Sequence, residues 1–122
     1  MTIIGAVRQV DGLRPNGYSL GQKILWLSQL ESMVQRLVID PYGREETRFT
    51  EFTEQTDTGT TLLMPAPFDM AYLYWLEAQI HYAGEDKELY NSAMAMFRAV
   101  FDAYKADYRR NRMPVGQGRF RF

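Results

Sequence analysis

The 122-residue chain is 46% hydrophobic and 14% aromatic, enough to fold as one domain around a modest core and too much for a disordered chain. Cysteine is absent, which excludes disulfides and thiolate metal sites. The net charge of −1 hides an asymmetry: positions 1–97 hold 7 lysines and arginines against 13 acidic residues, whereas positions 98–122 hold 7 against 2. The basic C-terminal part is therefore a candidate for contact with phosphates or an acidic partner.

The expected cellular compartment follows from two sequence features that are missing, a signal peptide and a membrane span. The first residues lack the basic start and long apolar run of a signal peptide. No stretch approaches the roughly 18 apolar residues of a membrane span. We therefore expect the protein in the cytoplasm.

Two helices are predicted in the N-terminal third. Apolar residues from Ile3 to Val10 recur at spacings that favour a short helix over residues 2–12. Ser19, with Gln22 three positions later, forms a capping-box pattern that opens an amphipathic helix over residues 20–38. Its predicted inner face comprises Leu20, Ile24, Leu27, Leu30, Val34, Leu37 and Val38. Trp26 lies beside this stripe, at the margin of the core or in an interface, and we favour the margin.

Residues 44–64 change character, since threonine becomes frequent and helical periodicity fails. Phe49 and Phe52 are three apart, so strict alternation would place them on opposite sides of a strand. We predict a long loop or irregular β-hairpin that projects from the helical body, less protected from hydrogen exchange than the helices. Pairing with a neighbouring subunit would satisfy its backbone groups.

The strongest pattern predicts a helical hairpin over residues 67–113. Pro67 suits a first helical position, with Asp69 in the first turn, and Gly84 suits a left-handed residue that ends the helix. Glu85-Asp86 and Glu88 then provide a cap and first-turn charge for a second helix of about 25 residues, nearly 40 Å long. The predicted buried face of that helix comprises Tyr90, Ala93, Phe97, Val100, Phe101, Tyr104 and Tyr108. The expected fold is mainly α: a small helical bundle built on this hairpin, with residues 1–114 as one domain.

A short tail, residues 115–122, follows Pro114. Two glycines favour flexibility, and alternation would place two arginines on one side of an extended strand and two phenylalanines on the other. We expect the tail to become ordered on a partner, the alternative being a tail without a role. Arginines at the end of the preceding helix either meet a partner or only complement the helix dipole. The candidate partner-facing or DNA-facing residues are Arg109, Arg110, Arg112, Arg119, Phe120, Arg121 and Phe122.

Recognisable catalytic chemistry is missing from the sequence. It contains no phosphate-binding glycine loop, paired zinc ligands or nucleophile elbow. The single histidine, His81, has Glu77 and Glu85 one helical turn away, a pattern more typical of solvated charges than of a metal site. The acidic residues near Glu51 lack EF-hand spacing. We therefore expect no enzymatic activity, no cofactor and no bound metal.

Several segments carry a resemblance to a known family. They are LLMPAPFD (residues 62–69), YLYWLEAQI (72–80), YNSAMAMF (90–97) and YRRNRMP (108–114), together with WLSQL (26–30). In this order they resemble small head-tail connector proteins encoded in the structural modules of tailed phages and Gram-positive prophages. The resemblance covers most of the chain and consists of packing and turn residues. His81 and the Arg/Phe tail depart from the family's pattern.

The resemblance implies a helical head-completion adaptor without enzymatic activity or cofactor. Such an adaptor forms a ring of about twelve copies beneath the portal protein, extends the DNA channel and contacts the next neck protein. It would reside in the virion neck, and in the host cytoplasm during assembly. The alternative hypothesis is a small nucleic-acid-binding regulator that uses the C-terminal arginines on phosphates, for which binding would weaken steeply with salt.

Overall fold

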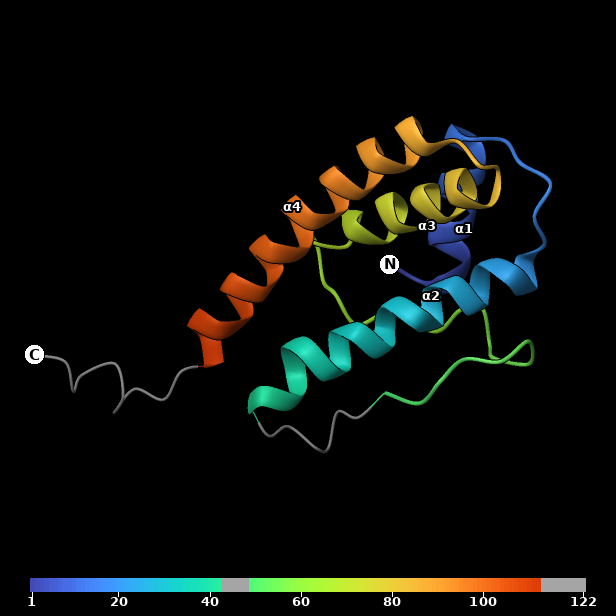
Figure 1. The fold of residues 1–122 in the computed structure, drawn as a ribbon. Helices are drawn as coiled ribbons and strands as arrows, with labels where there is room; N and C mark the ends of the chain where they lie inside the picture. Colours follow the sequence, from blue (N-terminus) through green and yellow to red (C-terminus); the bar gives the residue numbers. More distant parts are fainter. Residues whose placement is uncertain (43–48, 113–122) are drawn as a thin grey trace, which may run out of the picture.

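The computed structural model describes residues 1–42 and 49–112. The helices are α1 (Ile3–Leu13), α2 (Leu20–Val34), α3 (Met70–Ala83) and α4 (Lys87–Arg112), and α2 continues into a π-helical turn, η1 (Gln35–Ile39), and a 3₁₀ turn, η2 (Asp40–Tyr42). Within the described ranges there is no β-strand, only an isolated bridge between Thr2 and Thr61. The predicted mainly α fold, a small bundle with a long C-terminal hairpin, is confirmed (Figure 1).

α1 forms where the spacing of apolar residues predicted it. The Thr2 hydroxyl caps it by accepting a hydrogen bond from the Gly5 N–H at 3.1 Å. The helix buries one face, made of Ile3, Ala6, Val7 and Val10. An ion pair of 2.8 Å between Asp11 and the buried Lys23 ammonium connects α1 to α2.

α2 begins as predicted, because the Ser19 hydroxyl accepts a hydrogen bond from the Gln22 N–H at 3.1 Å. The predicted inner face is correct for its central residues but wrong for Leu20 and Leu37, which are exposed. Leu20 is the first residue of the helix, at its open end. Leu37 lies in the π-helical turn, whose wider winding shifts the phase of the following side chains. As a result Val38 and Ile39 are both buried and Leu37 is 55% exposed.

The predicted hairpin of α3 and α4 is present, with two corrections at its turns. Pro67 is not the first helical residue: it lies in a turn in which the Phe68 N–H bonds the Pro65 carbonyl, and α3 begins at Met70. Gly84 is not left-handed, with φ −86° and ψ 2°; the left-handed residue is Glu85, with φ 63°. The predicted cap is confirmed, since the Asp86 carboxylate accepts a hydrogen bond from the Leu89 N–H.

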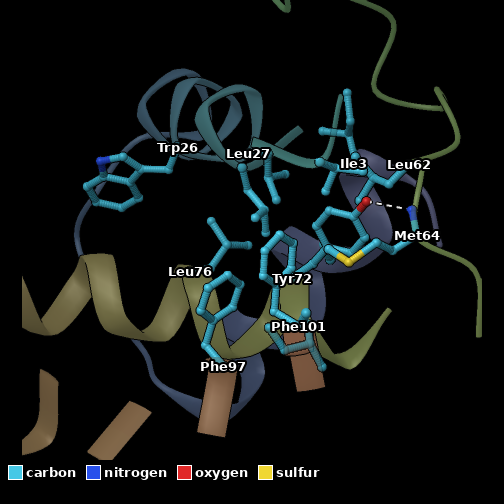
Figure 2. Packing of buried hydrophobic residues seen from close by; sticks show 14 of the residues in the cluster. Ile3, Trp26, Leu27, Leu62, Met64, Tyr72, Leu76, Phe97 and Phe101 are labelled. Carbon is cyan, nitrogen blue, oxygen red and sulfur yellow. Dashed lines mark hydrogen bonds between the residues drawn. The ribbon is translucent and has the colours of Figure 1, made fainter. Parts of the chain in front are cut away.

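α3 is the central helix, since it contacts α1, α2 and α4, and its most extensive contacts are with α4 (Figure 1). Of the predicted α4 face, five residues are buried, namely Ala93, Phe97, Phe101, Tyr104 and Tyr108, and Tyr90 and Val100 are half-buried. The Trp75 ring packs on Phe97 at 5.2 Å between centroids, and its indole N–H donates to the Trp26 carbonyl at 2.8 Å. Trp26 is itself buried and belongs to the same core cluster, and its ring lies at the edge of the side chains drawn in Figure 2.

Residues 49–64, which we call the strap, do not project from the body. Phe52, Leu62 and Met64 are buried in the core, and the strap packs against α1 and α2. The carbonyls of Thr60 and Thr58 accept hydrogen bonds from the N–H groups of Ile3 and Ile4 at 3.0 and 2.9 Å. These N–H groups are at the start of α1, where a helix has no internal acceptor for them. The strap therefore satisfies the donors at the start of α1. Residues 44–48 of the predicted loop lie outside the described residues.

Candidate functional site

The predicted partner-facing residues separate into two groups. Arg109 and Arg110 are exposed in the last turns of α4, and Arg112 is its final residue. The Arg110 guanidinium lies 3.3 Å from the Asp107 carboxylate one turn earlier. The tail residues Arg119, Phe120, Arg121 and Phe122 lie outside the described residues.

A surface hollow of about 380 Å³ places Arg109 beside the end of the N-terminal helices. One wall is apolar, formed by Leu37, Val38, Pro41 and Tyr42. The opposite wall belongs to α4 and carries Asp102, Lys105, Ala106 and Arg109. Because Lys105 is 3.4 Å from Asp102, Arg109 is the cation of this wall without a partner carboxylate among the described residues. The hollow suits a chemical group that is anionic at one end and apolar at the other.

α4 presents a second candidate surface on the side opposite α3. Its exposed residues there include four small ones, Ser92, Ala95, Ala99 and Ala103, beside Met96, which is 49% exposed, and the charged Arg98 and Asp102. Small side chains allow the backbone of another helix to approach closely. We call this surface the α4 outer face.

The turn between α3 and α4 carries the opposite charge to the C-terminal end of α4. Glu85, Asp86 and Glu88 surround a single lysine, Lys87. The exposed Tyr82 ring packs on Tyr90 at 5.4 Å between centroids, beside a hollow of about 790 Å³. The turn before α4 and the start of α4 are thus acidic and lie beside two aromatic rings, whereas the last turns of α4 are basic.

The only histidine, His81, lies beside one of its two predicted acidic neighbours. Its Nε2 lies 3.4 Å from the Glu77 carboxylate, which also accepts a hydrogen bond from Arg14 Nε at 2.9 Å. Glu85, the other predicted neighbour, lies in the left-handed turn instead of one helical turn away on α3. Across residues 1–42 and 49–112, no three His, Cys, Asp or Glu side chains form a group able to hold a metal ion.

A line of polar side chains along α2 and the first residue of η1 was not predicted. Ser28, Glu31 and Gln35 are buried at spacings of three and four, and each accepts a hydrogen bond from a backbone N–H of the strap. The donors are Phe52 at 3.0 Å, Leu63 at 2.7 Å and Phe49 at 2.7 Å, respectively. These side chains supply acceptors for the backbone N–H groups of the strap, as the backbone carbonyls of a neighbouring strand do in a sheet.

Glu31 is the one ionisable residue of this line and the most deeply buried of the three, at 1% exposure. Its second oxygen accepts a hydrogen bond from the Tyr72 hydroxyl at 2.5 Å, and that hydroxyl accepts one from the Met64 N–H at 2.8 Å (Figure 2). Burial raises the pKa of the Glu31 carboxyl from 4.5 to about 7, although both hydrogen bonds favour the charged form. Burial and the neighbouring Glu31 also raise the pKa of Tyr72, so the hydroxyl retains its proton and acts as a donor.

The spacing of residues in the sequence indicates that one member of this line, Glu31, is buried. Leu27 and Val34 lie four before and three after Glu31 on the same face of α2, so the carboxyl occupies a core position of the helix. A buried carboxyl requires donors, and its partners are 32 and 41 positions away. The helical pattern could therefore identify the residue but not what it binds.

In the parts of the chain that the structure describes, no helix has the length and apolar character needed to cross a membrane. Comparisons with known protein families, with curated proteins and with solved structures found no match to this chain.

Proposed function

We propose that the chain is a structural subunit of a phage particle, a head-tail connector that forms a ring beneath the portal protein. In this proposal the ring surrounds the DNA passage and contacts the next neck protein. The proposal rests on the resemblance of the packing and turn segments and on the shape of α4. It assigns the protein no catalytic step and no cofactor.

The observation that carries the proposal is the α4 outer face. α4 has 26 residues and its partner α3 only 14, so α3 covers one side of part of its length. The uncovered side carries small residues and the exposed Leu89 and Met96, which suits contact with a helix of another copy. A helix with this surface is expected in a subunit that packs side by side with others.

The two charged ends of α4 give the proposed ring two different rims. Arg109 and Arg110 at one end suit DNA phosphates or acidic residues of a neighbouring protein. Glu85, Asp86 and Glu88 at the other end would repel phosphates and suit a basic partner. The rims would thus select different neighbours above and below the ring.

Sedimentation of the full chain, alone and with its cognate portal protein, tests the proposal. The wild type is expected to form a ring, either alone or on the portal. Ala99→Glu places a charge on the α4 outer face and is expected to abolish assembly while leaving the helical content unchanged. Gln29→Glu, at an exposed position of α2, is the matched control and should assemble normally. A wild-type chain that stays monomeric at high concentration in both settings would contradict the proposal.

The second candidate is a nucleic-acid-binding regulator, favoured by the exposed Arg109 and Arg110 at one end of α4. It predicts tight binding to duplex DNA by the monomer. The logarithm of the binding constant would fall with the logarithm of salt concentration, with a slope of about −0.9 for each phosphate contacted. Glutamine at both arginines would then reduce the slope, whereas the connector proposal expects only weak DNA binding by the monomer.

A further inference from the structure

One buried carboxyl attaches two consecutive residues of the strap to the helical body. Glu31 accepts the Leu63 N–H directly, and it holds Tyr72, whose hydroxyl accepts the Met64 N–H. These contacts bring together α2, α3 and the strap, and Figure 2 shows the Tyr72 hydroxyl directed at the backbone of Met64. Anything that changes Glu31 therefore acts on both attachments together.

No cationic side chain among the described residues pairs with Glu31 when its carboxyl is ionised. Among residues 1–42 and 49–112, no lysine, arginine or histidine forms an ion pair with it, and the other buried charged residue of α2, Lys23, is paired with Asp11. α3 contributes the neutral Tyr72, and α4 contributes Tyr104, which affects Tyr72. The strap contributes another carboxylate, Glu51, on a hollow of about 400 Å³ that Glu31 also lines. An ionised Glu31 is thus stabilised by hydrogen bonds alone.

Protonation removes the cost of this buried charge without removing the contacts. The carbonyl oxygen of a protonated carboxyl still accepts the Leu63 N–H. The contact with Tyr72 is kept with its direction reversed: the carboxyl O–H donates to the Tyr72 oxygen, and the proton of Tyr72 turns away from Glu31. Ionisation has the reverse effect, since the docked strap leaves Glu31 only 1% exposed and lifting of the strap exposes the charge to water. The strap backbone has two other side-chain acceptors in this line, Ser28 on α2 and Gln35 at the start of η1, and both are uncharged and do not titrate.

We propose that Glu31 makes the docking of the strap pH-dependent: the segment around Leu63 and Met64 stays on the helical body while the carboxyl is protonated and lifts more often once it ionises. Lifting opens the core at Leu62 and Met64, both buried in the docked state. This property is independent of the proposed role in a phage particle. It concerns the isolated subunit and requires no partner.

Amide hydrogen exchange of the full chain at about pH 5 and about pH 8, corrected for intrinsic exchange rates, tests the proposal. Protection at Leu63 and Met64 is expected to fall by between about tenfold and 100-fold over this interval. Amides of α4 at Phe97 should stay better protected than these at both pH values, because the strap lifts without unfolding the helices. Equal protection at Phe97 and Met64 would overturn the proposal, since the strap would then open only with the whole protein.

Three variants complete the test. Glu31→Gln cannot ionise, so protection of the strap should become independent of pH, whereas Glu51→Gln, on the same hollow, should behave like the wild type. Tyr72→Phe removes a hydrogen bond that favours the ionised carboxyl, so the midpoint of the pH dependence should move upward. If Glu31→Gln does not fold, the Tyr72→Phe midpoint decides. An unmoved or lowered midpoint, or a pH dependence retained in a folded Glu31→Gln, would overturn the proposal.

Discussion

The α3–α4 hairpin and the strap are stabilised by different kinds of interaction. The hairpin consists of neighbouring segments joined by a short turn, and it buries one periodic face of α4 against α3. The strap buries only three large side chains, and its backbone bonds to α2 side chains and to the start of α1. The hairpin therefore depends on apolar area and the strap on individual hydrogen bonds. We therefore expect the stability of the hairpin to vary little with pH and the docking of the strap to depend on the protonation of Glu31.

The largest expected effect is on the hairpin. Phe97 is 2% exposed and contacts Trp75 and Phe101, so Phe97→Ala should lower the free energy of unfolding by about 3 to 5 kcal/mol. Denaturant unfolding measures this difference. The adjacent exposed residue gives the control, since Met96→Ala should change stability by less than about 0.5 kcal/mol. A loss below about 1 kcal/mol for Phe97→Ala would show that this face of α4 is not the core of the subunit.

The next effect concerns pH. Below pH 4.5 Glu31 is protonated in both the folded and unfolded states; above that, the unfolded chain loses its proton first because the folded pKa is raised to about 7. The contribution of Glu31 to stability is therefore complete below pH 4.5 and is lost as the pH rises through 7, by about 3 kcal/mol in all. The free energy of unfolding is measured for the wild type and for Glu31→Gln across this pH range. The difference between the two proteins isolates the contribution of Glu31 from that of the other carboxyls. A constant difference between the two proteins would contradict it.

A smaller effect is expected at the strap. Ser28→Ala removes the acceptor of the Phe52 N–H, which should lower the free energy of unfolding by about 1 kcal/mol. Hydrogen exchange should show the largest loss of protection at Phe52 itself. Ser32→Ala, on the same helix and only half-buried, should leave both quantities nearly unchanged. Identical behaviour of the two variants would mean that the bond to Phe52 contributes nothing measurable.

The smallest effect lies at the turn of the hairpin. Glu85 has φ 63°, a left-handed conformation that costs a residue with a side chain about 1 kcal/mol and costs glycine little. Glu85→Gly should relieve this strain but make the unfolded chain more flexible, for a net gain of about 0.5 kcal/mol. Thermal unfolding measures it. Gly84→Ala tests the neighbouring position, where φ is −86° and a Cβ would lie 3.4 Å from the Ile80 carbonyl oxygen, so it should give no gain.

These differences explain which parts could be predicted from the sequence. The buried face of α4 and the caps at Ser19 and Asp86 depend on residues within a few positions of each other, so spacing alone indicated them. The bonds from the strap backbone to Gln35, Ser28 and Glu31 join positions 14 to 32 residues apart, and no local pattern encodes them. Leu37 was placed on the wrong side because η1 changes the helical phase, which a constant period of 3.6 residues does not anticipate.

The candidate site also has a part that the sequence indicated and parts that only the folded chain brings together. Clustered arginines at the end of α4 indicated a charged end, and the structure places Arg109 and Arg110 there on the surface. The hollow beside Arg109 depends on residues from η1 and η2, which meet α4 only in the folded chain. The role of Glu31 was missed because a single glutamate in an amphipathic helix resembles any other until its neighbours in space are known.

The carbonyls of Thr58 and Thr60, which bond the first amides of α1, also constrain the order in which the chain can acquire structure. α1 precedes these residues by about half the chain, so during synthesis it emerges from the ribosome well before its own end can be completed. With 11 residues it is also too short to persist alone in water. Its formation therefore waits for a contact of large sequence separation, whereas α3 and α4 can pair as soon as their short turn has been made.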